Sequence, residues 1–72
     1  MATLSERLKE LRKSRNVTQK QISEYIKTDQ RNYRRYEAGI TDPTTKFAIR
    51  IADFYDVSID YLVGRSDNPE RR

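Results

Sequence analysis

Four side chains in the middle of the chain have the types and spacing for recognising nucleic-acid bases: Gln30, Arg31, Arg34 and Arg35. A glutamine amide carries a donor beside an acceptor, and an arginine guanidinium carries a planar fork of donors. These groups match the edges that adenine and guanine present in the major groove of duplex DNA. The pattern is therefore compatible with base contacts, first from Gln30 and Arg31, while Arg34 and Arg35 reach either bases or flanking phosphates. The solvated face of an amphipathic helix is the alternative explanation of the same four residues.

Other chemistry has little support in the sequence. The chain has no histidine and no cysteine, which removes the commonest general base, the commonest metal ligand and any thiolate site. The carboxylates Asp53, Asp56 and Asp60 form the only local acidic cluster, and they read as the polar surroundings of a helix end. We therefore expect no catalytic activity, metal, cofactor or small-molecule ligand.

The charge distribution also favours a polyanionic partner. The net charge is +4, but residues 1–36 hold ten Lys and Arg against four Asp and Glu, whereas residues 37–72 hold five against seven. An ordinary solvated surface remains the alternative explanation for this asymmetry. No apolar run approaches the roughly 20 residues that cross a bilayer, and the first ten residues do not resemble a signal peptide, so a cytoplasmic protein is expected.

Apolar residues recur at helical spacing between the Gly and Pro positions, which predicts five helices and an all-α fold. Helices are expected near residues 5–14, 18–26, 29–37, 44–55 and 58–63. Thr3 and Thr18 have capping-box spacing, whereas Thr28 or Asp29, and Asp42 or Thr44, are alternative caps for the third and fourth helices. Residues 1–64 are expected to form one compact domain, and residues 65–72 a flexible tail or the start of a linker.

The order and spacing of three stretches resemble a known family. RLKELRKSRNVTQKQISEYI, RRYEAG and DPTTKFAIRIADFYDVSIDYLVG together resemble the Cro/phage-repressor (XRE-type) helix-turn-helix domains over residues 4–64. The resemblance implies a repressor-like five-helix domain in which residues 18–26 and 29–37 form the helix-turn-helix. It places the small residue of the close helix contact at Ser23, and Lys27 at the usual turn glycine. A left-handed Lys27 is expected to cost about 1 kcal/mol.

The same resemblance assigns contacts around these helices. It implies a phosphate contact from Gln19 and an ion pair between Arg12 and Glu37. Further phosphate candidates are Thr18, beside the free N–H groups of its helix, and Lys20, Lys27 and Asn32. Three other cations are expected to add to the long-range field more than to contact: Lys9, Lys13 and Arg15.

The tyrosines permit a second mode of binding, in which exposed rings stack on a single strand. Tyr33, Tyr36 and Tyr55 have core-facing spacing, however, and on the predicted third helix Tyr33 and Tyr36 lie opposite the arginines. Burial is therefore the better interpretation of these three residues.

Surplus apolar residues on the fourth and fifth helices predict either a completed core or a dimer interface: Phe47, Ile49, Phe54, Ile59 and Val63. The family usually binds two half-sites about one helical turn apart. We expect a transcriptional regulator, with repression as its mode, that binds a near-palindromic double-stranded operator as a homodimer. An antitoxin or immunity component that also binds a partner protein is the alternative, and membrane binding is not expected.

Overall fold

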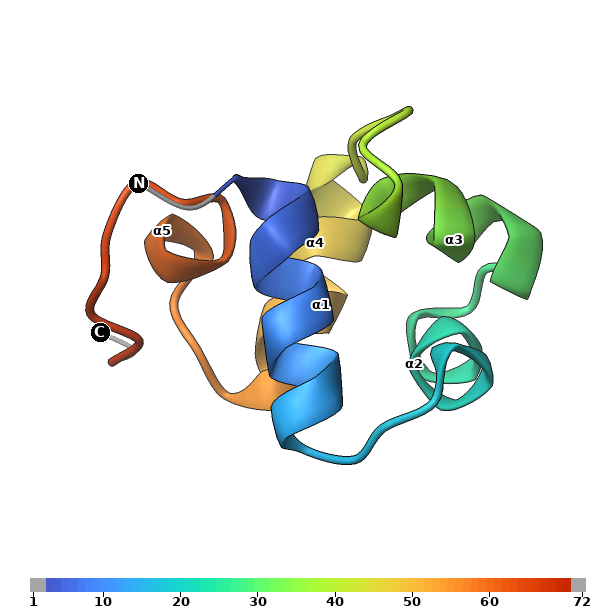
Figure 1. Ribbon diagram of the computed structural model, residues 1–72, viewed down its shortest axis with the longest axis horizontal. Coiled ribbons are helices and arrows are strands. Elements are labelled where there is room, and N and C mark those ends of the chain that lie inside the picture. The colour runs from blue at the N-terminus through green and yellow to red at the C-terminus, as the bar shows by residue number, and fades with distance from the viewer. Residues whose placement is uncertain (1–2, 71–72) are drawn as a thin grey trace.

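The computed structural model describes residues 3–70, and in this range the chain forms α-helices and no β-strand (Figure 1). The five helices are α1 (Leu4–Ser14), α2 (Gln19–Ile26), α3 (Gln30–Glu37), α4 (Thr45–Tyr55) and α5 (Ile59–Leu62). This confirms the all-α prediction. Residues 1, 2, 71 and 72 of the expected domain and tail lie outside the described residues. Within residues 3–70, no helix is both long and apolar enough to span a membrane.

Each helix begins at a side chain that accepts a hydrogen bond from the first turn. Thr3 and Thr18 form the two predicted capping boxes. Where the sequence left alternatives, the structure has Asp29 before α3 and Thr44 before α4. The side chain of Thr28 does not cap α3, because its Oγ1 accepts from Nδ2 of Asn32 at 2.8 Å.

Left-handed residues end or follow several helices. Asn16 and Gly39 have positive φ after α1 and α3, as their types predicted. Lys27 has φ 64° and ψ 46° and ends α2, so a lysine holds the conformation that glycine adopts most easily. Asp56 has φ 56° after α4, which the sequence analysis did not predict.

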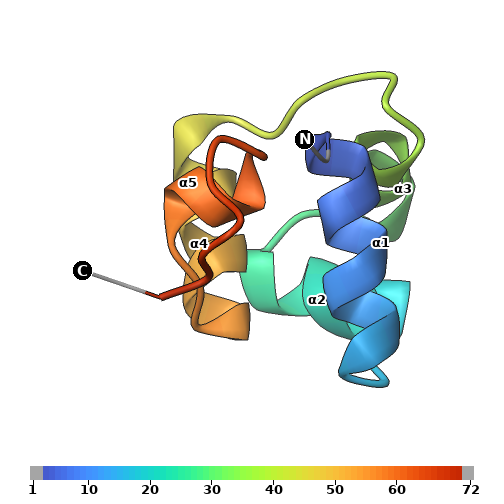
Figure 2. The ribbon, with the colours of Figure 1, turned by 60° about the vertical axis from the view of Figure 1, so that its left-hand side comes forward.

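The helices enclose one core, and the helix-turn-helix pair lies at one side of it. α1 packs against α3 and α5, while α4 packs against α2 and α5. Figure 1 shows α2 and α3 on the opposite side of α1 from α5, and Figure 2 shows α4 beside α5. The largest fully buried side chains come from all five helices and the α4–α5 turn: Leu8, Ile22, Ile26, Tyr33, Ile51, Tyr55, Val57 and Leu62.

Arg7 is buried in this fold, although the sequence analysis did not single it out. Its guanidinium lies 3.9 Å from the centre of the Tyr61 ring, and Nη2 lies 3.2 Å from Oδ1 of Asp67. The backbone N–H of Ser58 donates to the carbonyl of Pro69 at 3.0 Å. The segment after α5 therefore contacts α1 and the start of α5. Nothing in the local pattern around Arg7 marks it as a residue that two later segments cover.

Candidate nucleic-acid interface

Helix α3 has one side in the core and one side in solvent. Tyr33 and Tyr36 are buried and meet edge to face, with ring centres 6.1 Å apart. The four predicted base-reading side chains are all exposed: Gln30, Arg31, Arg34 and Arg35. A helix that lies in the major groove needs an exposed polar side toward the bases and an opposite side packed on the rest of the domain. Helix α3 has both. The tyrosines are on the side of α3 that faces the core, as the spacing predicted.

The turn between α2 and α3 is fixed by backbone contacts. The N–H of Thr28 donates to the carbonyl of Ser23 at 3.0 Å, and Ser23 itself is buried. Ser23 thus occupies the crowded position at which a small residue was expected. On α4, Nη1 of Arg50 donates to the carbonyl of Ile26 at 2.9 Å, which satisfies an acceptor at the end of α2. The sequence analysis missed Arg50, because only packing of α4 on α2 brings the two together.

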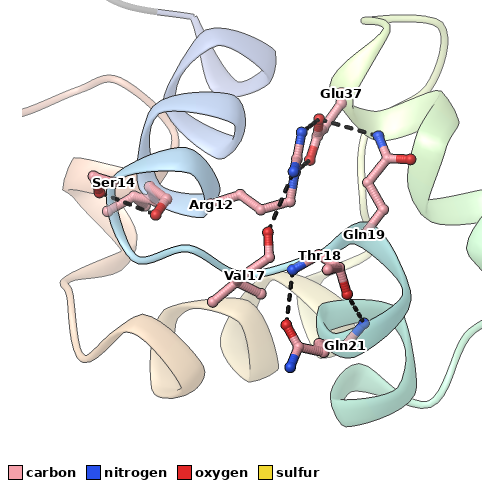
Figure 3. A network of polar contacts seen from close by, with 8 residues as sticks. Arg12, Ser14, Val17, Thr18, Gln19, Gln21 and Glu37 are labelled. Atoms are coloured by element: carbon pink, nitrogen blue, oxygen red, sulfur yellow. Dashed lines mark hydrogen bonds and ion pairs between the residues drawn. The ribbon is translucent and has the colours of Figure 1, made fainter.

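Arg12 and Glu37 join α1 to the end of α3 (Figure 3). Nε of Arg12 lies 2.7 Å from Oε2 of Glu37, and Nη2 lies 3.2 Å from Oε1. Nη1 of the same guanidinium donates to the carbonyl of Val17 at 3.3 Å. The ion pair that the resemblance implied is therefore present, with two hydrogen bonds and little exposure of either side chain.

Gln19 joins this network from the first turn of α2. Its Nε2 donates to Oε1 of Glu37 at 3.3 Å, so the residue expected to contact phosphate is held by α3 (Figure 3). Burial by itself raises the pKa of Glu37, but hydrogen bonds led by that from Arg12 outweigh burial and hold this pKa below its ordinary value. Glu37 is consequently ionised at neutral pH, and its charge is matched by Arg12.

The remaining phosphate candidates differ in availability. Thr18, Lys20 and Lys27 are exposed at the first turn or the end of α2. The amide nitrogen of Asn32 instead donates to Oγ1 of Thr28 at 2.8 Å and to the hydroxyl of Tyr36 at 2.9 Å. Both of its N–H groups are therefore engaged within the domain in this conformation, which the sequence analysis did not foresee.

Arg15 has a specific contact in addition to its charge. Its Nη1 donates to the carbonyl of Tyr55 at 3.1 Å, at the last residue of α4. A cation beside the terminal carbonyls of a helix is favourable, because these groups carry partial negative charge. The sequence analysis did not predict this contact within the domain, and the contribution of Arg15 to the long-range field stays a prediction.

The apolar residues proposed for a dimer interface divide into two groups. Phe47 and Phe54 pack against the core, as the alternative explanation required. Ile49, Ile59 and Val63 remain exposed, at 46%, 39% and 37% of their surface. Ile49 lies on α4, Ile59 on α5 and Val63 directly after α5. Figure 2 shows α4 and α5 on the opposite side of the view from α3.

Comparison with known proteins identifies the family. A family described as "Helix-turn-helix" matches residues 8–62, which include α2, α3 and the turn between them. The chain belongs to this family. It is 37% identical over 90% of its length to the HTH-type transcriptional regulator YobD of Bacillus subtilis. It is 40% identical over 86% of its length to the cryptic phage CTXphi transcriptional repressor RstR of Vibrio cholerae.

A solved structure supports the same assignment. The transcriptional regulator from Listeria innocua superposes with a TM-score of 0.83 at 34% identity, over 86% of this chain and 58% of that one. The chain also spans only 58% of YobD and 55% of RstR. This chain therefore corresponds to a little more than half the length of each of these three proteins.

Proposed function

We propose that this chain is the sequence-specific DNA-binding domain of a transcriptional repressor and that it reads the major groove with α3. The observation that carries the proposal is the division of α3: a back fixed by Tyr33, Tyr36 and Glu37, and a face of glutamine and arginines in solvent. The names of its relatives, which include a transcriptional repressor, support regulation by repression.

Within this proposal the residues have different roles. Gln30 and Arg31, in the first turn of α3, contact base edges, where a good bidentate pair discriminates by about 1–3 kcal/mol. Arg34 and Arg35 lie one turn further along and contact bases or the flanking phosphates. Thr18, Gln19, Lys20 and Lys27 contact the backbone and set the orientation of the domain on DNA.

The size of the domain supports binding to a near-palindrome by two copies. The Cα atoms extend over 28 × 23 × 21 Å, whereas half-sites one turn apart have centres about 34 Å apart. Two domains therefore fit side by side on one face of the duplex with their surfaces in reach of each other. We place the contact at the exposed apolar residues on α4, on α5 and directly after α5: Ile49, Ile59 and Val63.

Selection of bound duplexes from a random pool tests the proposal. Two matching half-sites with dyad symmetry are the expected result, together with affinity that falls steeply as salt rises. Sedimentation at micromolar protein, with and without the selected duplex, tests the dimer. Binding of equal strength to all duplexes would contradict sequence-specific reading, and one monomer per selected duplex would contradict the dimer.

A further inference from the structure

The segment after α5, residues 65–70, turns back and lies beside that helix, on the side away from α2 and α3 (Figure 1). The carbonyl of Asp60 accepts from the first two N–H groups of the segment, at 2.8 and 3.2 Å. Further along, the carbonyl of Pro69 accepts from the N–H of Ser58, directly before α5, at 3.0 Å. Backbone hydrogen bonds therefore attach the segment at two places.

The segment also has hydrogen bonds of its own. Oγ of Ser66 accepts from the N–H of Asn68 at 3.0 Å, and Oδ1 of Asn68 accepts from the N–H of Glu70 at 3.1 Å. A side chain that accepts from a backbone N–H two residues later stabilises a turn. Part of the backbone is thus restricted by local bonds, which lowers the entropy that the segment loses when it lies against the domain.

Arg7 of α1 joins this segment to α5. The Arg7 side chain is buried, its guanidinium lies 3.9 Å from the centre of the Tyr61 ring, and Nη2 donates to Oδ1 of Asp67 at 3.2 Å. Asp67 is its one ion-pair partner among residues 3–70. Because a buried cation is costly without a counter-charge, the covered position of Arg7 depends on the carboxylate that the segment brings.

Helix α5 needs these contacts to keep its position. It has four residues, and a single helical turn is unstable alone because nucleation restricts several residues for the first hydrogen bond. Leu62 fixes it to the core, whereas Tyr61 is held by Arg7 and the backbone by the following segment. Ile59 begins α5 and Val63 directly follows it, so the place of two residues of the proposed contact between copies depends on this attachment.

We propose that residues 65–70 are a strap that holds α5 in position for the contact between two copies on DNA, and that Arg7 is the positioning residue that fastens the strap and α5 to α1. The inference rests on the proposed function and deepens it. Since the strap is not a DNA contact, its release should weaken the binding of two copies to one duplex and leave the binding of a single copy unchanged.

Hydrogen exchange at one amide reports whether the strap lies against the domain. The N–H of Ser58 bonds to the strap, whereas the N–H of Thr44, at the same position before α4, has no acceptor among residues 3–70. Relative to the rate of an unprotected amide, Ser58 of the wild type should exchange at least about tenfold more slowly than Thr44. If the two amides exchange alike, residues 65–70 are a flexible tail and the proposal is wrong.

Two charge reversals in the strap form a matched pair of variants. Asp67→Lys places a second cation beside buried Arg7 and should release the strap, so that Ser58 exchanges as readily as Thr44. Glu70→Lys changes the net charge equally, in the same segment, but Glu70 forms no ion pair among the described residues. There the exchange of Ser58 should remain within about twofold of the wild type. Equal release in both variants would overturn the role of Arg7.

Binding to the selected duplex and to a duplex with one half-site then tests what the strap does. Because the two variants have the same net charge, long-range attraction to DNA is matched between them. Asp67→Lys should bind one half-site within about twofold of Glu70→Lys, which also shows that both are folded. It should bind the two-half-site duplex at least about tenfold more weakly, because both copies must have α5 in position.

The outcomes separate this inference from the proposed function. If Asp67→Lys releases the strap but binds the two-half-site duplex as tightly as Glu70→Lys does, the role of the strap in the contact between copies is wrong and the proposed function stands. If the wild type selects no duplex, the proposed function is wrong, and so is the role of the strap in binding. The exchange of Ser58 in the two variants still decides whether Arg7 fastens the strap.

Discussion

Arg12 of α1 and Glu37 of α3 are 25 residues apart in sequence, yet they meet through two hydrogen bonds of 2.7 and 3.2 Å. Their side chains are exposed by only 18% and 5%. The two parallel bonds fix both the distance and the angle between the carboxylate and the guanidinium. The end of the proposed reading helix is thus attached to α1 by a directional contact in addition to apolar packing.

Replacing Arg12 by alanine should destabilise the domain strongly. The change leaves Glu37 buried without its cation, and breaking a buried pair in this way costs about 3 kcal/mol. For a domain of this size the melting temperature should fall by more than about 10 °C. Thermal unfolding measures the effect, with Lys9→Ala as a control that should remain within about 0.5 kcal/mol of the wild type. An unchanged melting temperature for Arg12→Ala would show that the pair has no role in stability.

Acid should weaken the domain through Glu37. Its pKa lies below the ordinary value of 4.5, so the folded chain binds this proton less tightly than the unfolded chain does. The stability that ionised Glu37 contributes is therefore complete above about pH 4.5 and is lost as the pH falls through the lower pKa of the folded state. Urea unfolding between pH 7 and pH 3 should show a shallower decline in Glu37→Gln than in the wild type. If stability declines as steeply in Glu37→Gln as in the wild type, Glu37 is not the group responsible. Glu24→Gln is the control, because it removes an exposed negative charge.

Alkaline pH should act through Tyr55. Burial, and then the charge of Glu37, raises its pKa from 10.0 to about 12. Since the folded state holds this proton more tightly, the contribution is present below about pH 10 and is lost as the pH rises toward 12. The hydroxyl has no hydrogen-bond partner among the described residues, so Tyr55→Phe should change stability at pH 7 by less than about 1 kcal/mol. The stability of Tyr55→Phe should also decline less steeply at alkaline pH than that of the wild type. A loss of stability above about 2 kcal/mol in this variant at pH 7 would reveal a hydrogen-bond partner for the hydroxyl.

Replacing Lys27 by glycine should stabilise the fold. Its φ of 64° is left-handed, which a lysine adopts at a cost that glycine avoids. Lys27→Gly should raise the free energy of unfolding by about 0.5–1 kcal/mol, whereas Lys20→Gly within α2 should lower it by about 1 kcal/mol. Chemical denaturation compares the two variants. A destabilised Lys27→Gly would mean that contacts of the lysine side chain outweigh the backbone strain.

Two alanine variants should separate base reading from phosphate binding. Arg31→Ala should reduce affinity for the selected duplex by about 1–3 kcal/mol and relax the preference at one base pair of each half-site. Lys20→Ala should weaken binding to all duplexes similarly and reduce the dependence on salt. Titrations against the selected duplex and its single-base variants measure both effects. Equal losses on every duplex for Arg31→Ala would reassign this residue to the backbone.

Features that depend on neighbours in sequence were predictable. Thr3 and Thr18 cap their helices through bonds to residues three positions later, and this geometry is available to the chain before any tertiary contact forms. Asn16 and Gly39 follow helix ends with positive φ, which glycine adopts because it has no Cβ and asparagine tolerates better than most residues. The sequence could not decide between Thr28 and Asp29 as the cap of α3, since both residue types cap helices well. In the structure Asp29 is the cap, and Oγ1 of Thr28 accepts from the side chain of Asn32.

Features that depend on packing were not predictable from residue type. Arg7, Arg15 and Arg50 are all arginines, yet the first is covered by Tyr61 and Asp67, and the other two donate to carbonyls of different helices. A long cationic side chain can reach many partners, and the core selects one by fixing which helix end lies nearby. The sequence by itself determined the helices, the capping boxes at Thr3 and Thr18, and the polar face of α3. The tertiary structure decided which cations bind within the domain and which, as at Lys13 and Lys20, face outward, because that depends on distances between helices that no local pattern encodes.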